Sequence, residues 1–282
     1  GRFRLNPHDT VIAASLRKYG EFAEHELMLL GTFLEENQTV IDVGANIGTH
    51  TIFFSKQVGE NGSVVAIEAQ PKIHELLLEN ISLNDCKNVS ALNAAAGSAA
   101  GFLTAPRLDY DRDGNFGAFS FRLQDIGKYL PVAAMGEEMQ VEVLPIDALD
   151  LENCDLIKID AEGMERDILL GATRTIETHR PILYVENNAK EASSALIALI
   201  AELNYRACWH VISYFRADNF RACPDNIFPM PLELNMLCLP AEAGQEPVGL
   251  PPVTHPQQWL PDDLGAGVVS LDALLQTAES FG

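Results

Sequence analysis

Short apolar runs recur along the chain and alternate with stretches of helical periodicity. Val40, Ile41 and Val43 form the first run, which is continuous and β-branched as in a strand buried on both faces. The further runs lie at 63–68, 89–95, 155–160, 181–186, 205–210 and 235–239. Helical patterns occupy 9–18, 23–34, 49–57, 164–170 and 190–203, and another helix begins at Pro71. This alternation predicts an α/β fold with a mostly parallel sheet covered on both faces.

Polar side chains stand where these predicted strands end. In an open parallel sheet, ligands bind outside the carboxyl ends of the strands. We therefore expect a site at one edge of the sheet, formed by Asp42, Glu68, Asn93, Asp160 and Glu186.

A glycine turn joins the first strand to the helix that begins at Thr49. Gly44, Asn46 and Gly48 form it, and their spacing differs from the Gly-x-Gly-x-x-Gly turn that binds the pyrophosphate of NAD. Glu68 closes the second strand 20 residues after Gly48, where a carboxylate can accept both hydroxyl protons of a ribose. A ribose clamp without a pyrophosphate turn suggests S-adenosylmethionine (SAM). The alternative is that the glycines only pack helix against strand.

Composition narrows the choice of partners. The 282 residues include 40 acidic and 19 basic side chains, for a net charge of −21, and no basic run is present. Such a chain should bind neither nucleic acid nor an anionic membrane. We see no apolar run of about 18 residues and no secretory signal. The five cysteines are scattered, which favours reduced thiols and a cytoplasmic protein over a disulfide framework or zinc site.

Three parts are predicted along the chain. Residues 1–38 are a helical lead-in, 39–240 form the main domain, and 241–282 form a tail rich in proline and glycine with one short helix at 271–278. Within the domain, the glycine- and aspartate-rich segment 105–138 is predicted to be a substrate-side loop between short strands at 102–105 and 140–144. The alternative for that loop is a surface insertion without a binding role.

With these residues in view, the chain resembles the FkbM-type SAM-dependent methyltransferases. The resemblance covers roughly residues 20–240 and rests on two motifs, Asp42-Val-Gly-Ala-Asn-Ile-Gly48 and Lys158-Ile-Asp-Ala-Glu-Gly-Met-Glu165. Shorter matches extend it at 68, 115–117, 171–172, 180–181 and 185–186. It implies the class I methyltransferase fold, a Rossmann-like sandwich with a seven-stranded sheet whose last strand is antiparallel. It also implies O-methylation, often of sugars or other hydroxylated natural products.

The resemblance also implies roles for single residues. The turn Gly44–Gly48 would hold the methionine part of SAM, Thr51 its carboxylate, and Glu68 the ribose. Asn93 and Ala94 would border the adenine, and Asp160 would face the methionine amine or the reacting centre. The full predicted cofactor set is Asp42, Gly44, Asn46, Gly48, Thr51, Glu68, Asn93, Ala94 and Asp160.

Methyl transfer to a hydroxyl usually needs a base, and Asp160 and Glu186 are the candidates by position. Asp160 could instead only bind the cofactor, and Glu186 could instead cap the next helix or bind a backbone amide. A second mechanism would place Mg²⁺ on Asp160, Glu186 and Asn187, as in the catechol-type O-methyltransferases. Because the flanking residues match the FkbM proteins better, we predict no metal ligands.

Two classes of function follow. The first is an O-methyltransferase that acts on a small glycosylated or polyhydroxylated acceptor and releases S-adenosylhomocysteine (SAH). The second is a catalytically silent SAM-binding scaffold within a larger assembly, which the tail at 241–282 suggests. A nicotinamide oxidoreductase is disfavoured because the phosphate fingerprint is missing. The acceptor and the oligomeric state are not encoded in any recognisable pattern.

Overall fold

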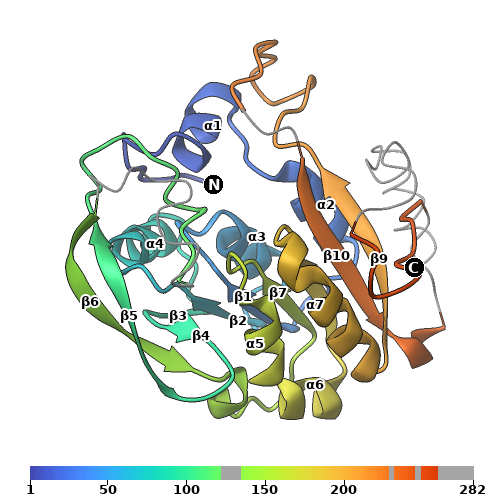
Figure 1. Ribbon diagram of the computed structural model, residues 1–282. Coiled ribbons are helices and arrows are strands. Elements are labelled where there is room, and N and C mark those ends of the chain that lie inside the picture. The colour runs from blue at the N-terminus through green and yellow to red at the C-terminus, as the bar shows by residue number, and fades with distance from the viewer. Residues whose placement is uncertain (122–134, 229–231, 245–248, 260–282) are drawn as a thin grey trace.

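A seven-stranded sheet runs through the centre of the protein (Figure 1). The structure is a computed structural model that describes residues 1–121, 135–228, 232–244 and 249–259. The strand order is β3-β2-β1-β7-β8-β10-β9. The bounds are β1 (Thr39–Val43), β2 (Ser63–Ile67), β3 (Val89–Leu92), β7 (Leu156–Ile159), β8 (Ile182–Glu186), β9 (Tyr205–Ile212) and β10 (Glu233–Pro240). β10 pairs antiparallel with both of its neighbours, and the other pairs are parallel, which confirms the predicted fold class.

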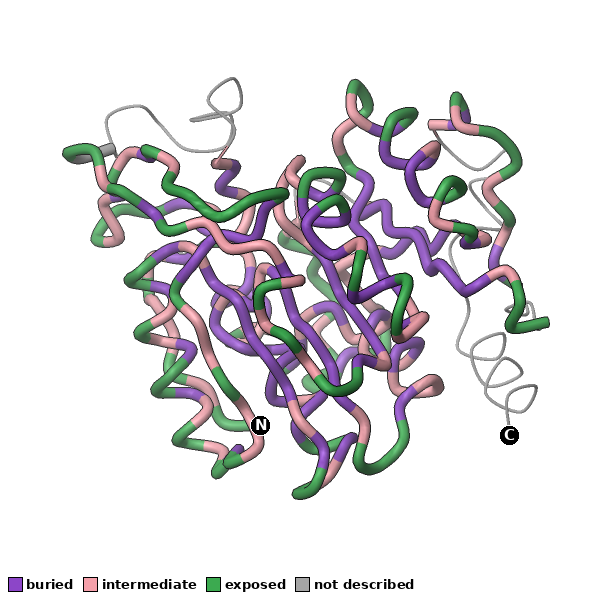
Figure 2. Tube along the Cα trace, turned by 90° about the horizontal axis from the view of Figure 1, so that it is seen from below, coloured by how far each residue is buried: buried purple, intermediate pink, exposed green. Residues whose placement is uncertain are grey.

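Helices cover both faces of this sheet. Their bounds are α1 (Ile12–Tyr19), α2 (Glu24–Gly31), α3 (Thr49–Gln57), α4 (Pro71–Leu83), α5 (Glu165–Leu170), α6 (Thr173–His179) and α7 (Lys190–Glu202). Successive residues of β1 explain the two layers. Ile41 packs in one cluster with side chains of α5, α6 and α7, whereas Val40 packs in another with side chains of α2 and α3. Figure 2 accordingly shows the central strands buried along their length.

Several predicted strand boundaries were wrong. The run at 89–95 divides into β3 and the short β4 (Ala95–Ala96), which joins a separate three-stranded sheet of order β4-β6-β5. The other two strands of that sheet, β5 (Gly101–Leu108) and β6 (Met135–Leu144), are antiparallel partners. Because they pair with each other, they extend into the segment 105–138 that was predicted as a loop, and residues 122–134 of it lie outside the described part.

Helix α6 was not predicted, because its sequence is rich in threonine and lacks an apolar stripe. Its first turn is instead held by a distant carboxylate. Asp147 accepts hydrogen bonds from the backbone N–H of Arg174 (3.0 Å) and of Thr175 (2.8 Å). This interaction satisfies amides that a helix N-terminus leaves free.

The lead-in and the segment 213–228, between β9 and β10, are joined above the carboxyl ends of the parallel strands (Figure 1). The Tyr19 hydroxyl donates to the carbonyl of Asp225 (2.5 Å) and accepts from the backbone N–H of Ile227 (2.9 Å). The Glu21 carboxylate accepts from the backbone N–H of Phe220 (2.9 Å). We call these two segments together the cap.

Part of the predicted tail packs on the sheet. The backbone N–H of Trp209 in β9 donates to the carbonyl of Pro251 (2.8 Å), and Leu250 is buried. The short helix predicted at 271–278 lies outside the described residues. In the described ranges, no helix combines the length and apolarity needed to cross a bilayer.

Candidate active site

A pocket lies between the carboxyl ends of the parallel strands and the cap. The turn after β1, the residues after β2, strand β4 with the residue before it, and the turn after β7 form its floor. The cap contributes Phe22, Ala23 and Tyr214, and the segment after β5 contributes Asn115, Gly117, Phe119 and Phe121. Part of the predicted substrate-side loop therefore does reach the pocket.

Glycine in the turn after β1 is required by contacts within the protein. Gly44 has φ +74°, and a Cβ atom there would lie 1.8 Å from the carbonyl oxygen of Asp160. Gly48 has φ +92°, and its Cβ would lie 2.8 Å from the Leu77 side chain. The packing role considered for these glycines is thus present at both positions. Gly44 and Asn46 also line the pocket, but Gly48 does not.

Glu68 lies at the end of β2, as predicted, and faces the pocket. Its two carboxylate oxygens accept hydrogen bonds from the backbone N–H of Asn46 (2.9 Å) and of Gln70 (2.8 Å). Burial raises the pKa of Glu68 to about 7, although these two N–H donors oppose the shift. A carboxylate offers about four acceptor positions, so lone pairs remain for hydroxyl groups of a ligand.

The two residues predicted to border the adenine differ in burial and in position relative to the pocket. Ala94 is buried and lines the pocket together with Ala95 and Ala96. Asn93 is exposed and outside the pocket wall, where its side-chain amide donates to the carbonyl of Glu68 (2.8 Å). Asn93 therefore helps to hold the end of β2 in place.

Asp42 and Thr51 lie beneath the pocket and do not line it. Both are fully buried, and the Thr51 hydroxyl donates to Asp42 over 2.6 Å. Thr51 is thus engaged within the protein, so the structure does not support its predicted contact with a cofactor carboxylate. Lys158 lies beside them, with its ammonium 3.5 Å from Asp42 and 3.2 Å from Asp160.

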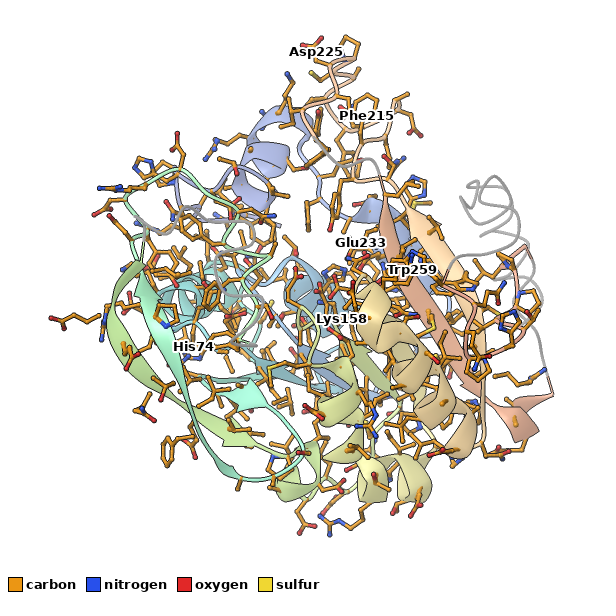
Figure 3. The ribbon with its side chains drawn as sticks, viewed as in Figure 1. His74, Lys158, Phe215, Asp225, Glu233 and Trp259 are labelled. Carbon is orange, nitrogen blue, oxygen red and sulfur yellow. The ribbon has the colours of Figure 1, made fainter. Side chains whose placement is uncertain are left out.

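Lys158 belongs to the second motif, but the sequence alone predicts no role for its side chain. Its side chain is 2 % exposed and lies near the centre of the molecule, as Figure 3 shows. Burial disfavours its charge, but the carboxylates of Asp160, Asp42 and Glu26 outweigh burial and raise the pKa of Lys158. The ammonium is therefore charged at neutral pH and stabilises the acidic groups around it.

A second buried pair in the pocket wall was not predicted from the sequence. His50 in α3 lies 2.9 Å from the carboxylate of Glu26 in α2, and the Asn235 amide donates to the same carboxylate over 3.2 Å. Burial raises the pKa of Glu26 to about 8 and lowers that of His50 to about 4. Glu26 has no sequence signal for this role, because a glutamate in the first turn of a helix is usually solvated.

The turn after β7 brings three carboxylates together. Oxygen atoms of Asp160, Glu162 and Glu186 lie within 4.8 Å of one another. Asp160 lines the pocket, whereas Glu186 is 2 % exposed and does not. Glu186 accepts a hydrogen bond from the backbone N–H of Glu162 (3.3 Å), one of the two other roles considered for it.

Asn187, the third residue of the alternative Mg²⁺ site, is buried. Its side-chain amide donates to the sulfur of Met236 (3.5 Å) in the core.

Comparisons with known proteins agree with this architecture. Residues 42–207, more than half of the chain, match the Methyltransferase FkbM domain family. A curated relative, Methyltransferase sdnD of Sordaria araneosa, is 27% identical over 160 residues, which cover 49% of this chain and 61% of the relative. The chain thus spans less than two thirds of that relative's length.

Solved structures of other methyltransferases match this chain at low sequence identity. Methyltransferase FkbM from Methylobacillus flagellatus KT is 17% identical with a TM-score of 0.45, and the match covers 73% of this chain and 47% of that one. An O-methyltransferase from Bacillus cereus in complex with SAH is 15% identical with a TM-score of 0.46, and the match covers 80% and 85%. On the strength of the match over residues 42–207, the chain belongs to the FkbM family of methyltransferases.

Proposed function

We propose that this protein is a SAM-dependent O-methyltransferase that acts on a hydroxyl group of a small glycosylated or polyhydroxylated molecule. One observation carries the cofactor assignment: Glu68 is fixed by two backbone amides at the end of β2 and faces the pocket. A carboxylate held in this way suits the two hydroxyls of a ribose. The small side chains of Ala94, Ala95 and Ala96 leave room beside it for a flat base.

The charges of the pocket wall fit the rest of the cofactor. Among its described residues, the acidic ones are Glu26, Glu68, Asp160, Glu162 and Glu233, and the basic one besides His50 is Lys158. These carboxyl groups attract a cation when they are ionised, and SAM carries a positive sulfonium and an ammonium group. Asp160 is suited to the ammonium because it is partly exposed at the end of β7. In this proposal, Asp42, Gly48 and Thr51 support the turn from below.

When bound, SAM supplies an electrophilic methyl group. The protein then has to align the acceptor oxygen with that methyl group and remove the hydroxyl proton. Asp160 is less suited to take the proton than the sequence suggested, because its carboxylate is paired with Lys158 at 3.2 Å. Glu186 is held by the amide of Glu162, so we assign it to shaping the turn after β7.

We also propose a cellular compartment and a class of partner for this protein. All five cysteines lie in the described residues and none forms a disulfide, which is typical of a reducing, cytoplasmic environment. With its net charge of −21, we expect the protein to act on a small molecule and not on nucleic acid or at a membrane surface.

The test is calorimetric titration with SAM and SAH, with and without EDTA and added Mg²⁺. We expect both ligands to bind, and we expect EDTA to leave the binding unchanged. Transfer of an isotopically labelled methyl group to a panel of hydroxylated compounds, glycosides first, then identifies the acceptor class. Folded protein that binds neither SAM nor SAH would refute the cofactor assignment, and a heat of Mg²⁺ binding lost in Asp160→Asn would favour the metal-assisted mechanism.

A silent SAM-binding scaffold is the second candidate. It predicts SAH binding without methyl transfer to any compound of the panel. The retention of several acidic side chains around the pocket favours the enzyme.

A further inference from the structure

Glu233 is a buried acidic group in the wall of the pocket. It is the first residue of β10, and because β10 is antiparallel, this residue lies at the same edge of the sheet as the ends of β1, β7 and β8. Its exposed fraction is 4%, and it lines the pocket. Figure 3 shows Glu233 at the upper end of β10, above Lys158 and below the cap.

Tyr214 of the cap and Glu233 both line the pocket, and each side chain contributes to the pKa shift of the other. The Tyr214 ring is stacked on Phe22 of the lead-in, with centroids 5.0 Å apart and planes 20° apart. This stacking fixes the ring between the two segments of the cap, in the same pocket wall as Glu233.

The surroundings of Glu233 are mostly acidic. Burial raises its pKa well above the usual value, the carboxylates of Glu26 and Asp160 add to the shift, and Tyr214 and Lys158 oppose it. Burial and the neighbouring carboxylates therefore favour the protonated form of Glu233 in the free protein. The charged and titratable groups that act on it from the neighbouring elements are Glu26 of α2, Lys158 and Asp160 at β7, Tyr184 and Glu186 of β8, and Tyr214 of the cap.

Building on the proposed function, we propose that Glu233 is the catalytic base and that the positive charge of the bound cofactor makes it available by expelling its proton. The reason is electrostatic, since a cation within the pocket favours the anionic form of a nearby carboxyl group. In the transfer step, the acceptor hydroxyl gives its proton to Glu233 while its oxygen forms a bond to the methyl carbon. The sulfur–methyl bond breaks, and its electron pair stays on sulfur as a neutral thioether.

This arrangement couples the base to the cofactor. Without the sulfonium charge, Glu233 is a neutral acid and cannot accept a proton from the acceptor. Tyr214 is a positioning residue in this scheme, because its hydroxyl stabilises the carboxylate through a hydrogen bond.

SAM and SAH are a matched pair of probes, since only SAM carries the sulfonium charge. Titration of each ligand in two buffers of different ionisation enthalpy near pH 7 measures the protons released on binding. We expect wild-type protein to release more protons with SAM than with SAH. We expect Glu233→Gln to lose at least half of that difference, and Glu60→Gln, the same change at an exposed residue of the α3–β2 turn, to keep it.

The pH dependence of SAM and SAH binding provides a second test, which needs no methyl acceptor. If one proton is released, the affinity for SAM relative to SAH rises with pH by up to about tenfold per unit. Tyr214→Phe should move this rise to higher pH, because the carboxylate loses a donor. With the first compound methylated in the panel above, Glu233→Gln should lower kcat by about 100-fold or more and leave KM for SAM within threefold.

The outcomes separate the two proposals. Absence of SAM and SAH binding by the wild type would refute the proposed function itself. Binding of both ligands with equal proton release, or a Glu233→Gln variant that releases as many protons and turns over as fast as the wild type, would overturn only the role of Glu233.

Discussion

Replacing Lys158 by methionine should strongly destabilise the protein, because Asp42 would lose its positive partner. Asp42 is fully buried, and the ammonium of Lys158 lies 3.5 Å from it. At this distance and an effective dielectric constant of about 20, the attraction is about 5 kcal/mol. Removing one member of a buried pair typically lowers the free energy of unfolding by about 3–5 kcal/mol, since the other charge stays buried without compensation. We expect a loss in that range for Lys158→Met.

A double-mutant cycle in urea unfolding measures this effect. Asp42→Asn removes the buried negative charge that Lys158→Met leaves without a partner. The double variant Lys158→Met with Asp42→Asn should therefore be more stable than Lys158→Met alone. Lys56→Met, at an exposed position of α3, serves as the control and should change stability by less than about 0.5 kcal/mol. A loss below about 1 kcal/mol for Lys158→Met, or no recovery in the double variant, would refute this account of the buried pair.

Three further predictions concern the pocket and its turn. Glu68→Gln should weaken SAH binding by about 1–3 kcal/mol in calorimetry, because a ribose hydroxyl loses its acceptor, and unchanged affinity would exclude the ribose role. The folded-state pKa of Glu68 is raised from 4.5 to about 7, so the protonated side chain contributes to the free energy of unfolding. This contribution is fully present below pH 4.5 and is lost as the pH rises through 7. The free energy of unfolding, measured in denaturant from pH 4.5 to 8, should therefore decline less in Glu68→Gln than in the wild type. Gly44→Ala should lower the melting temperature much more than Gly101→Ala, because an added Cβ meets a backbone oxygen at 1.8 Å in the first case and nothing within 4 Å in the second; equal effects would contradict the packing role of Gly44.

Much of the fold could be predicted from local pattern. Val40, Ile41 and Val43 predict a strand buried on both faces, and the segment 49–57 after the glycine turn is predicted as a helix; β1 and α3 form at these positions. The predictions failed where distant residues decide the outcome. Helix α6 depends on the side chain of Asp147, and β5 and β6 extend because each satisfies the backbone of the other.

The sequence by itself determined the α/β architecture, the family and the carboxylates at the strand ends, because these features are encoded in short contiguous motifs. Only the tertiary structure decided which of them face the pocket. It turned Thr51 inward to Asp42, and it brought Glu26 of the lead-in and Glu233 of β10 to the same pocket. The physical reason is that β10 runs antiparallel to its neighbours, so its first residue lies at the edge where the parallel strands end. Burial and neighbouring charges then set the charge of each group, and both are properties of the folded chain.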